Sequence, residues 1–141
     1  MAKHVYDDLE LLMRRIHVNT FNYGRGILSK YNLSNSQFNI IVFIYFHGAK
    51  NLKELCAELL LAPSTISEMI VRMEDSQLVA KKRHEIDKRK IVIDITEKSR
   101  EIVNSVIKKR VEFVKNITVQ LPPDKLEELR ILLTKMVECL K

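Results

Sequence analysis

The segment formed by residues 62–78 limits the possible folds of this chain more than any other part. Its apolar residues recur at intervals of three and four, the spacing of one helix face. They are Ile66, Met69, Ile70 and Met73. The opposite face carries short hydroxyl groups and charges, namely Ser64, Thr65, Glu68, Arg72 and Asp75. Pro63 suits the first turn, with the cap at Ala62 or Ser64. This outward face suits DNA bases and phosphates, although an ordinary amphipathic surface helix has the same periodicity.

A second short helix is predicted directly before that segment. Asn51 can cap it while Glu54, three residues later, reaches back to the cap, which is the capping-box pattern. Its predicted buried face consists of Leu52, Leu55, Cys56, Leu59 and Leu60. Two short helices joined by a tight turn, the second with a polar outer face, form a helix-turn-helix.

The segment after the helix-turn-helix is strongly basic. Six of the eleven residues in 80–90 are Lys or Arg. Residues 91–95 then alternate with a period of two, which indicates a strand. A charge run is often only a solvated loop. Because this one directly follows a helix-turn-helix and leads into a strand, we predict a β-hairpin that acts as a wing.

The central core helix is predicted between residues 34 and 48. Ser34 and Gln37 form a second capping box, and the apolar run 40–46 follows. So short an apolar run is also compatible with a strand, but the capping box favours a helix. Gly48 is expected to end it.

Three apolar helical stripes lie toward the two ends of the chain, in residues 5–16, 102–117 and 126–140. The first helix is predicted to continue to Lys30. The second is predicted to begin at a Thr96 cap, and a proline pair separates it from the third. Since the winged segment is too small to cover all three stripes, we expect them to form a second, helical layer.

The composition narrows the class of protein. A length of 141 residues predicts one domain, and a net charge of +6 favours a polyanionic partner, either nucleic acid or an anionic membrane. No apolar signal sequence begins the chain, and the longest apolar run, residues 40–46, is too short to span a bilayer. We therefore expect a cytoplasmic protein without a membrane partner.

Catalytic and metal-binding patterns are missing from the sequence. No glycine-rich phosphate loop or nucleophile–histidine set is present, and the histidines lack ligand spacing: His4, His17, His47 and His84. We therefore predict no enzyme activity, no cofactor and no metal. Cys56 lies on a predicted apolar face and suits the core, while Cys139 lies near the end, so redox sensing is the weaker alternative. Three tyrosines suit either a ligand cavity or a dimer interface, namely Tyr23, Tyr31 and Tyr45.

The order of predicted elements resembles the MarR family of bacterial transcriptional regulators (multiple antibiotic resistance regulators) over essentially the whole chain. The best local matches are Leu33-Ser34-x-x-Gln37-Phe38, Leu55-Cys56-Ala57, Pro63-Ser64-Thr65-Ile66-Ser67, Arg72-Met73-Glu74, Leu78-Val79, Asp87-Lys88-Arg89 and Ile95-Thr96.

The chain departs from the family pattern at three positions. Gln77 stands where the family usually has glycine before the wing, and Ser99 stands where it has glycine after the wing. Glu68 stands where a basic residue is common. A carboxylate repels phosphate and favours a cytosine amine, which changes the expected base contacts.

The resemblance implies a mainly α fold with a small β-hairpin, in one domain over residues 1–141. Residues 31–96 would form the winged helix-turn-helix DNA-binding part, and residues 1–30 and 97–141 the helical dimerisation part. The resemblance further implies a homodimeric repressor that binds double-stranded, pseudo-palindromic operator DNA. In many relatives a small-molecule effector releases the DNA.

In this arrangement the helix from Pro63 would enter the major groove, and Arg89, oriented by Asp87, the minor groove. The candidate DNA-binding residues are Ser36, Gln37, Ser64, Thr65, Ser67, Glu68, Arg72, Lys81, Lys82, Arg83, Asp87, Lys88, Arg89 and Lys90. The alternative function is a winged-helix protein-interaction module without sequence-specific DNA binding.

Overall fold

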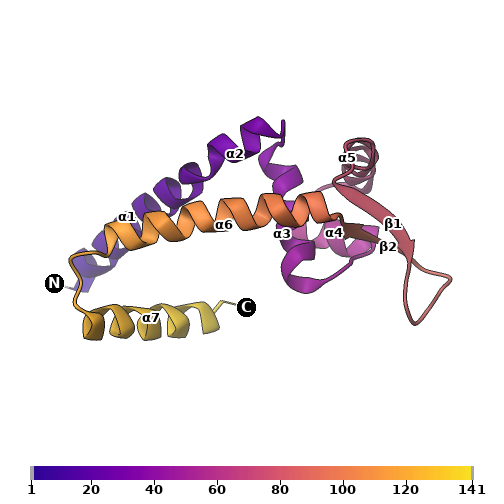
Figure 1. Cartoon of the computed structure of the whole chain (residues 1–141). Coiled ribbons are helices and arrows are strands. Elements are labelled where there is room, and N and C mark those ends of the chain that lie inside the picture. The colour runs from indigo at the N-terminus through magenta and orange to yellow at the C-terminus, as the bar shows by residue number, and fades with distance from the viewer. Residues whose placement is uncertain (1, 141) are drawn as a thin grey trace. The chain divides into compact units, whose positions relative to one another are not determined.

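The structure, a computed structural model, describes residues 2–140 and consists of helices with one two-stranded antiparallel hairpin (Figure 1). In chain order the elements are α1 (Ala2–Tyr23), α2 (Arg25–Lys30), α3 (Asn35–His47), α4 (Leu52–Leu59), α5 (Pro63–Asp75), β1 (Val79–Arg83), β2 (Ile91–Ile95), α6 (Glu97–Ile117) and α7 (Pro123–Glu138). The predicted fold class, mainly α with a small β-hairpin, is confirmed.

The chain divides into two compact units. Residues 24–108 form the winged unit, and residues 1–23 with 109–141 form the terminal-helix unit. The division falls within α6, a continuous helix that belongs to both units. The winged unit contains the whole predicted DNA-binding part, residues 31–96, together with α2 and the first half of α6.

The hydrophobic core lies in the winged unit. Ile40 and Ile41 of α3 are fully buried, and Leu55 of α4 packs in the same cluster. The predicted apolar face of α5 is confirmed, because Ile66, Ile70 and Met73 are buried and Met69 packs half-buried against the core. The first half of α6 closes the core with Ile102, Val103 and Val106.

Both predicted capping boxes are present. The Ser34 hydroxyl accepts from the Gln37 backbone N–H at 3.1 Å, and the Gln37 side chain accepts from the Ser34 N–H at 2.9 Å. The same exchange joins Asn51 and Glu54 at the start of α4. Gly48 ends α3 with φ 82°, a conformation that favours glycine.

Two helix ends differ from the prediction. The first helix does not continue to Lys30: α1 ends at Tyr23 and α2 begins after Gly24, since glycine costs about 1 kcal/mol in a helix interior. Leu60, predicted to be buried, is 88% exposed. It follows the last residue of α4 in the left-handed conformation, φ 54°, so it no longer continues the helical face.

The strand β2 differs from the predicted alternation as well. Val92 and Ile93 are both buried, whereas Ile91 is exposed. The backbone of Lys50 pairs with Ile93 through two hydrogen bonds of 3.0 and 2.7 Å. The strand therefore has a second backbone partner besides β1, and Val92 and Ile93 show that both of its faces carry buried side chains.

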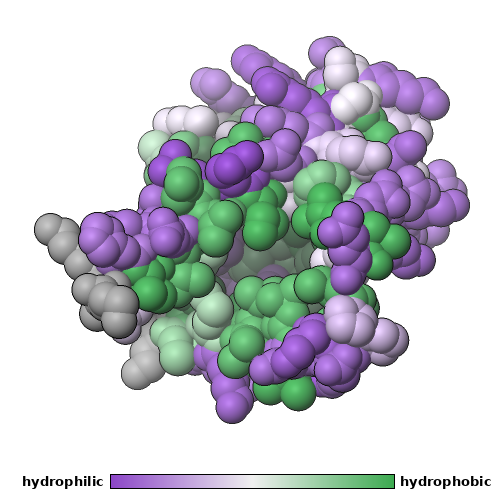
Figure 2. Space-filling view, turned by 90° about the vertical axis from the view of Figure 1, so that its left-hand side faces the viewer, coloured by the Kyte–Doolittle hydropathy of each residue, from purple (hydrophilic) through white to green (hydrophobic). Residues whose placement is uncertain are grey.

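The terminal-helix unit contrasts with the winged unit in its lack of burial. Along α7, no described residue is buried, and Val5, Leu12 and Ile16 of α1 are about half exposed. Figure 2 shows apolar side chains gathered on the visible face of these helices. Inside the unit, the Tyr23 and Phe113 rings lie 5.1 Å apart.

Of the described helices, none has the length and apolarity needed to cross a membrane.

Candidate nucleic-acid interface

The helix-turn-helix consists of α4, the turn at residues 60–62, and α5, with α4 and α5 in contact. Of the two possible caps, Ala62 is the N-cap of α5, and Pro63 occupies the first turn as predicted. Alanine has no side-chain acceptor, so no side chain caps the first backbone N–H groups of α5. A helix N-terminus of this kind favours a negatively charged ligand.

The outward face of α5 is polar and open. Its predicted contact residues Ser64, Thr65, Ser67, Glu68 and Arg72 are all exposed. Within the described part of the chain, none of these five side chains has a hydrogen-bond or ion-pair partner. Their groups remain available for a ligand.

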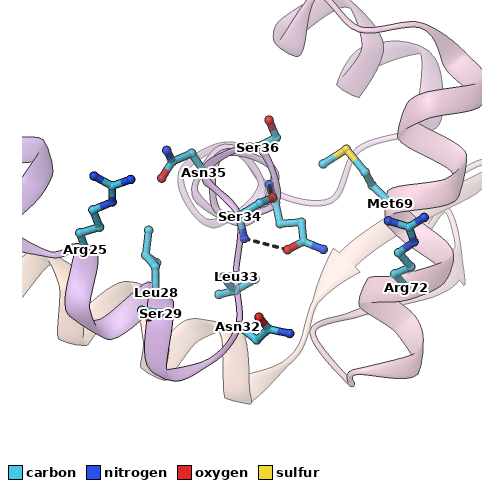
Figure 3. A pocket seen from close by; sticks show the side chains of 11 residues that line it. Arg25, Leu28, Ser29, Asn32, Leu33, Ser34, Asn35, Ser36, Met69 and Arg72 are labelled. Atoms are coloured by element: carbon cyan, nitrogen blue, oxygen red, sulfur yellow. Dashed lines mark hydrogen bonds between the residues drawn. The ribbon is translucent and has the colours of Figure 1, made fainter.

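A cavity of about 770 Å³ lies between α2, the start of α3 and α5 (Figure 3). Ser36 and Gln37, two predicted DNA-binding residues, line it half-buried. The Gln37 side-chain oxygen is occupied by the capping box at Ser34, drawn as a dashed line in Figure 3. Arg25 also lines the cavity, a basic residue that the sequence analysis did not select.

The predicted wing is a hairpin with Val79 opposite Ile95 and Arg83 opposite Ile91, and Figure 1 shows its loop extending beyond the strands. The loop is shaped by His84. Its Nδ1 atom accepts backbone hydrogen bonds from Ile86 at 3.2 Å and Asp87 at 3.1 Å. No motif in the sequence marks this role.

Asp87 and Arg89 are joined within the loop. The Arg89 backbone N–H and Nε both donate to Asp87 Oδ1, at 3.2 and 3.4 Å. The Arg89 side chain is nevertheless 94% exposed. That Asp87 orients Arg89 for the minor groove stays a prediction.

Three of the predicted phosphate contacts are engaged within the chain. Lys81 lies 3.5 Å from Glu74, Lys82 Nζ lies 2.7 Å from Asp94 Oδ2, and Arg83 Nη1 donates to the Lys88 carbonyl at 2.9 Å. Lys88 and Lys90 are exposed, and the described residues offer their side chains no partner.

The Lys82–Asp94 contact also shifts the pKa values of both side chains. The hydrogen bond to Asp94 raises the pKa of Lys82 above its ordinary value. Burial by itself would raise the pKa of Asp94, but the hydrogen bonds from Lys82 and the Ile95 backbone, with the nearby charge of Arg100, hold it below its ordinary value. Both shifts favour the charged forms, so the ion pair persists at neutral pH.

The comparisons with known proteins identify the family. The family model described as "Transcriptional regulator SarA/Rot" matches residues 23–106. The HTH-type transcriptional regulator MgrA of Staphylococcus aureus is 30% identical over 82% of this chain and 77% of that protein. A solved structure of a MarR family protein from Bacillus stearothermophilus is 29% identical, covers 98% of this chain and 96% of that one, and has a TM-score of 0.85. The chain belongs to the MarR family.

This MarR-family protein is therefore a DNA-binding transcriptional regulator with a winged helix-turn-helix. The solved structure of an S. aureus MepR variant bound to an oligodeoxyribonucleotide has a TM-score of 0.67, with 94% of this chain and 98% of that one covered. At 20% identity this likeness shows the fold alone.

The remaining sequence hypotheses about this MarR-family regulator concern histidine, cysteine and tyrosine. Among residues 2–140, no group of three or more His, Cys, Asp or Glu side chains is arranged to hold a metal. Cys56 packs half-buried against the core, as predicted, and Cys139 is exposed. The Tyr45 hydroxyl lies 2.8 Å from Asn104 Oδ1. Tyr31 and Tyr45 do not line the cavity of Figure 3, and the choice between ligand cavity and dimer interface stays a prediction.

Proposed function

We propose that this MarR-family regulator is a cytoplasmic, homodimeric repressor of pseudo-palindromic operator DNA. The observation that carries the proposal is the open polar face of α5. Its five exposed side chains have no partner among the described residues, while its opposite face is buried in the core. In a dimer, two such helices would enter successive major grooves about one helical turn apart.

The α5 residues have distinct proposed roles. Thr65 offers a hydroxyl and a methyl that suit thymine, and Arg72 can contact a guanine or a phosphate. Glu68 is exposed on the same face, where its carboxylate would select a cytosine amine and disfavour nearby phosphates. Ser64 and Ser67 would contact phosphates or bases with their hydroxyls.

The wing is proposed to contact the minor groove through Arg89. The hydrogen bond from Arg89 Nε to Asp87 limits the freedom of the Arg89 side chain before binding, which reduces the entropy lost on contact. A narrow minor groove concentrates negative potential and favours an inserted guanidinium. Lys88 and Lys90 would contact phosphates directly. Lys81, Lys82 and Arg83 would add charge while they retain their internal contacts.

The terminal-helix unit is proposed as the dimerisation part. Its exposed apolar side chains form a surface that a monomer rarely leaves uncovered. A second copy of the chain would bury it. Release of the operator by a small-molecule effector is a further part of the proposal, and its test is the effect of candidate compounds on operator binding.

The proposal is tested by operator binding of wing variants, after selection of the bound sequence from random DNA. Arg89→Ala is expected to weaken binding by about 1–3 kcal/mol, the scale of one arginine contact, and Arg89→Lys to recover part of it because an ammonium lacks the planar fork. Asp87→Ala is expected to weaken binding as well, although it removes a negative charge.

The matched control is Asp75→Ala, which removes an exposed carboxylate of the same unit that has no partner among the described residues. Removing Asp75 should leave binding unchanged or strengthen it slightly, as charge counting predicts. Tighter operator binding by Asp87→Ala, with an unchanged circular dichroism spectrum, would contradict the wing assignment.

A further inference from the structure

The cavity between α2, α3 and α5 is not explained by base reading from α5 or by the wing. It lies entirely within the winged unit, and Figure 3 shows Arg25 and Arg72 at its two ends with Ser34, Asn35 and Ser36 between them. The residues that line it are Arg25, Leu28, Ser29, Asn32, Leu33, Ser34, Asn35, Ser36, Gln37, Met69 and Arg72.

The charges around this cavity have one sign. Two guanidinium groups line it, and no lining residue is acidic. In the part of the chain that the structure describes, neither Arg25 nor Arg72 has an ion-pair or hydrogen-bond partner for its side chain. Unpaired like charges around one concave surface indicate a site for negative groups, because the surrounding chain does not compensate them.

The neutral polar groups of the cavity also suit a ligand with negative groups. Ser29, Asn32 and Asn35 contribute hydroxyl and amide groups that make no hydrogen bond within the described residues. The 13-residue helix α3 begins here, and its positive dipole end adds to the field of the two arginines.

We propose that this cavity holds consecutive phosphate groups of one DNA strand, with Arg25 as a phosphate contact outside both α5 and the wing. The proposal rests on the proposed function, since it assumes that α5 occupies the major groove. The separation of Arg25 and Arg72 at opposite ends favours a run of phosphates over a single small anion. Arg72 lies on α5 and lines the cavity. Contacts with the DNA phosphates here would therefore adjust the position of α5 relative to the bases.

The test uses the full-length protein with Arg25→Ala, titrated with operator and with random duplex over a range of salt concentrations. A phosphate contact carries no sequence information, so affinity should fall by a similar factor for both duplexes. For a dimer that loses two phosphate contacts, the log–log salt slope should become less steep by about 1.8, from about 0.9 per phosphate. Arg25→Lys should restore the slope.

The matched control is Lys30→Ala, which removes a positive charge from the same helix at a residue that does not line the cavity. This variant should keep the slope of the unaltered protein. An unchanged slope in Arg25→Ala, or an equal change in Lys30→Ala, overturns the proposal.

Two further measurements separate the alternatives. The Arg89→Ala variant tests DNA binding independently of the cavity: if Arg89→Ala weakens operator binding and Arg25→Ala does not, only the cavity assignment fails. Titration with inorganic phosphate at constant ionic strength, followed by amide NMR shifts, tests a free phosphate compound as the ligand. Saturable shifts at Asn35 and Ser36 that disappear in Arg25→Ala, together with an unchanged DNA salt slope, would overturn the DNA assignment.

Discussion

The two units of this regulator differ in where their apolar side chains lie. All of the buried hydrophobic side chains that the structure describes belong to the winged unit, with Ile40 at 0% exposure in the middle of α3. In the terminal-helix unit, comparable side chains such as Leu12, at 51%, remain exposed. The winged unit therefore has a core of its own, whereas the terminal helices carry apolar surface in excess of what they cover.

This difference predicts that the stability of the two units depends differently on protein concentration. Stability that arises from a core within one chain does not depend on protein concentration, whereas stability that arises from contact between copies does. Two pairs of substitutions test this contrast, and a third pair tests a local feature of the winged unit, in order of decreasing expected effect.

The largest expected effect is that of truncating a side chain in the hydrophobic core. Ile40→Ala removes fully buried methyl groups and should lower the free energy of unfolding by about 2–5 kcal/mol. Leu12→Ala removes a half-exposed side chain of α1 and should change the unfolding of dilute protein by less than about 0.5 kcal/mol. Urea unfolding of both variants at low protein concentration measures the contrast. Equal losses would mean that α1 is as well packed within one chain as α3.

The next effect concerns association. Leu133→Glu places a charge on the apolar surface of α7 and should weaken the dimer by at least about 2 kcal/mol, or roughly 30-fold. Leu60→Glu is the control, because Leu60 is still more exposed but belongs to the winged unit. Sedimentation equilibrium should show dissociation of the first variant only. A monomeric intact protein would remove the basis of the comparison.

The smallest effect lies at one backbone position of the winged unit. Gln77 has φ 59°, a conformation that costs an L-residue roughly 1–2 kcal/mol and glycine almost nothing. Gln77→Gly should therefore raise the free energy of unfolding by up to about 1 kcal/mol, after the larger entropy loss of glycine is subtracted. Gln77→Ala keeps the Cβ atom and should bring no gain. Thermal unfolding of the two variants decides between these outcomes.

The features predicted correctly from the sequence are those that depend on neighbouring residues. The capping boxes at Ser34 and Asn51 need only a side chain and a backbone group three residues apart, so they could be identified directly. The open face of α5 followed from the helical period. Leu60 shows the limit of this reasoning. The hydrophobic period of the sequence continues through Leu60, although the helix α4 ends one residue earlier.

The features that could not be predicted depend on contacts between distant segments. Lys82 on β1 pairs with Asp94 on β2, and only the pairing of the hairpin strands brings them together. Lys81 on β1 pairs with Glu74 on α5, which depends on how the chain turns between that helix and the strand. Val92 and Ile93 point to opposite faces of β2 and are both buried, so their burial depends on segments that pack on both faces of the strand. Arg25 was not predicted for the same reason, because it lines one cavity with residues of α5 only in the folded chain.

The continuity of α6 has a mechanical consequence. At its start, the Ser99 hydroxyl donates to the Leu78 carbonyl at 2.6 Å, and Thr96 Oγ1 donates to the Gln77 carbonyl at 2.7 Å. The base of the helix is thereby tied to the chain that links α5 to the wing. A helix of 21 residues is about 31 Å long, and a tilt of about 5° displaces its far end by about 3 Å. A small rotation of α6 about its far end would thus shift the segment that links α5 to the wing by a distance comparable to the length of a hydrogen bond.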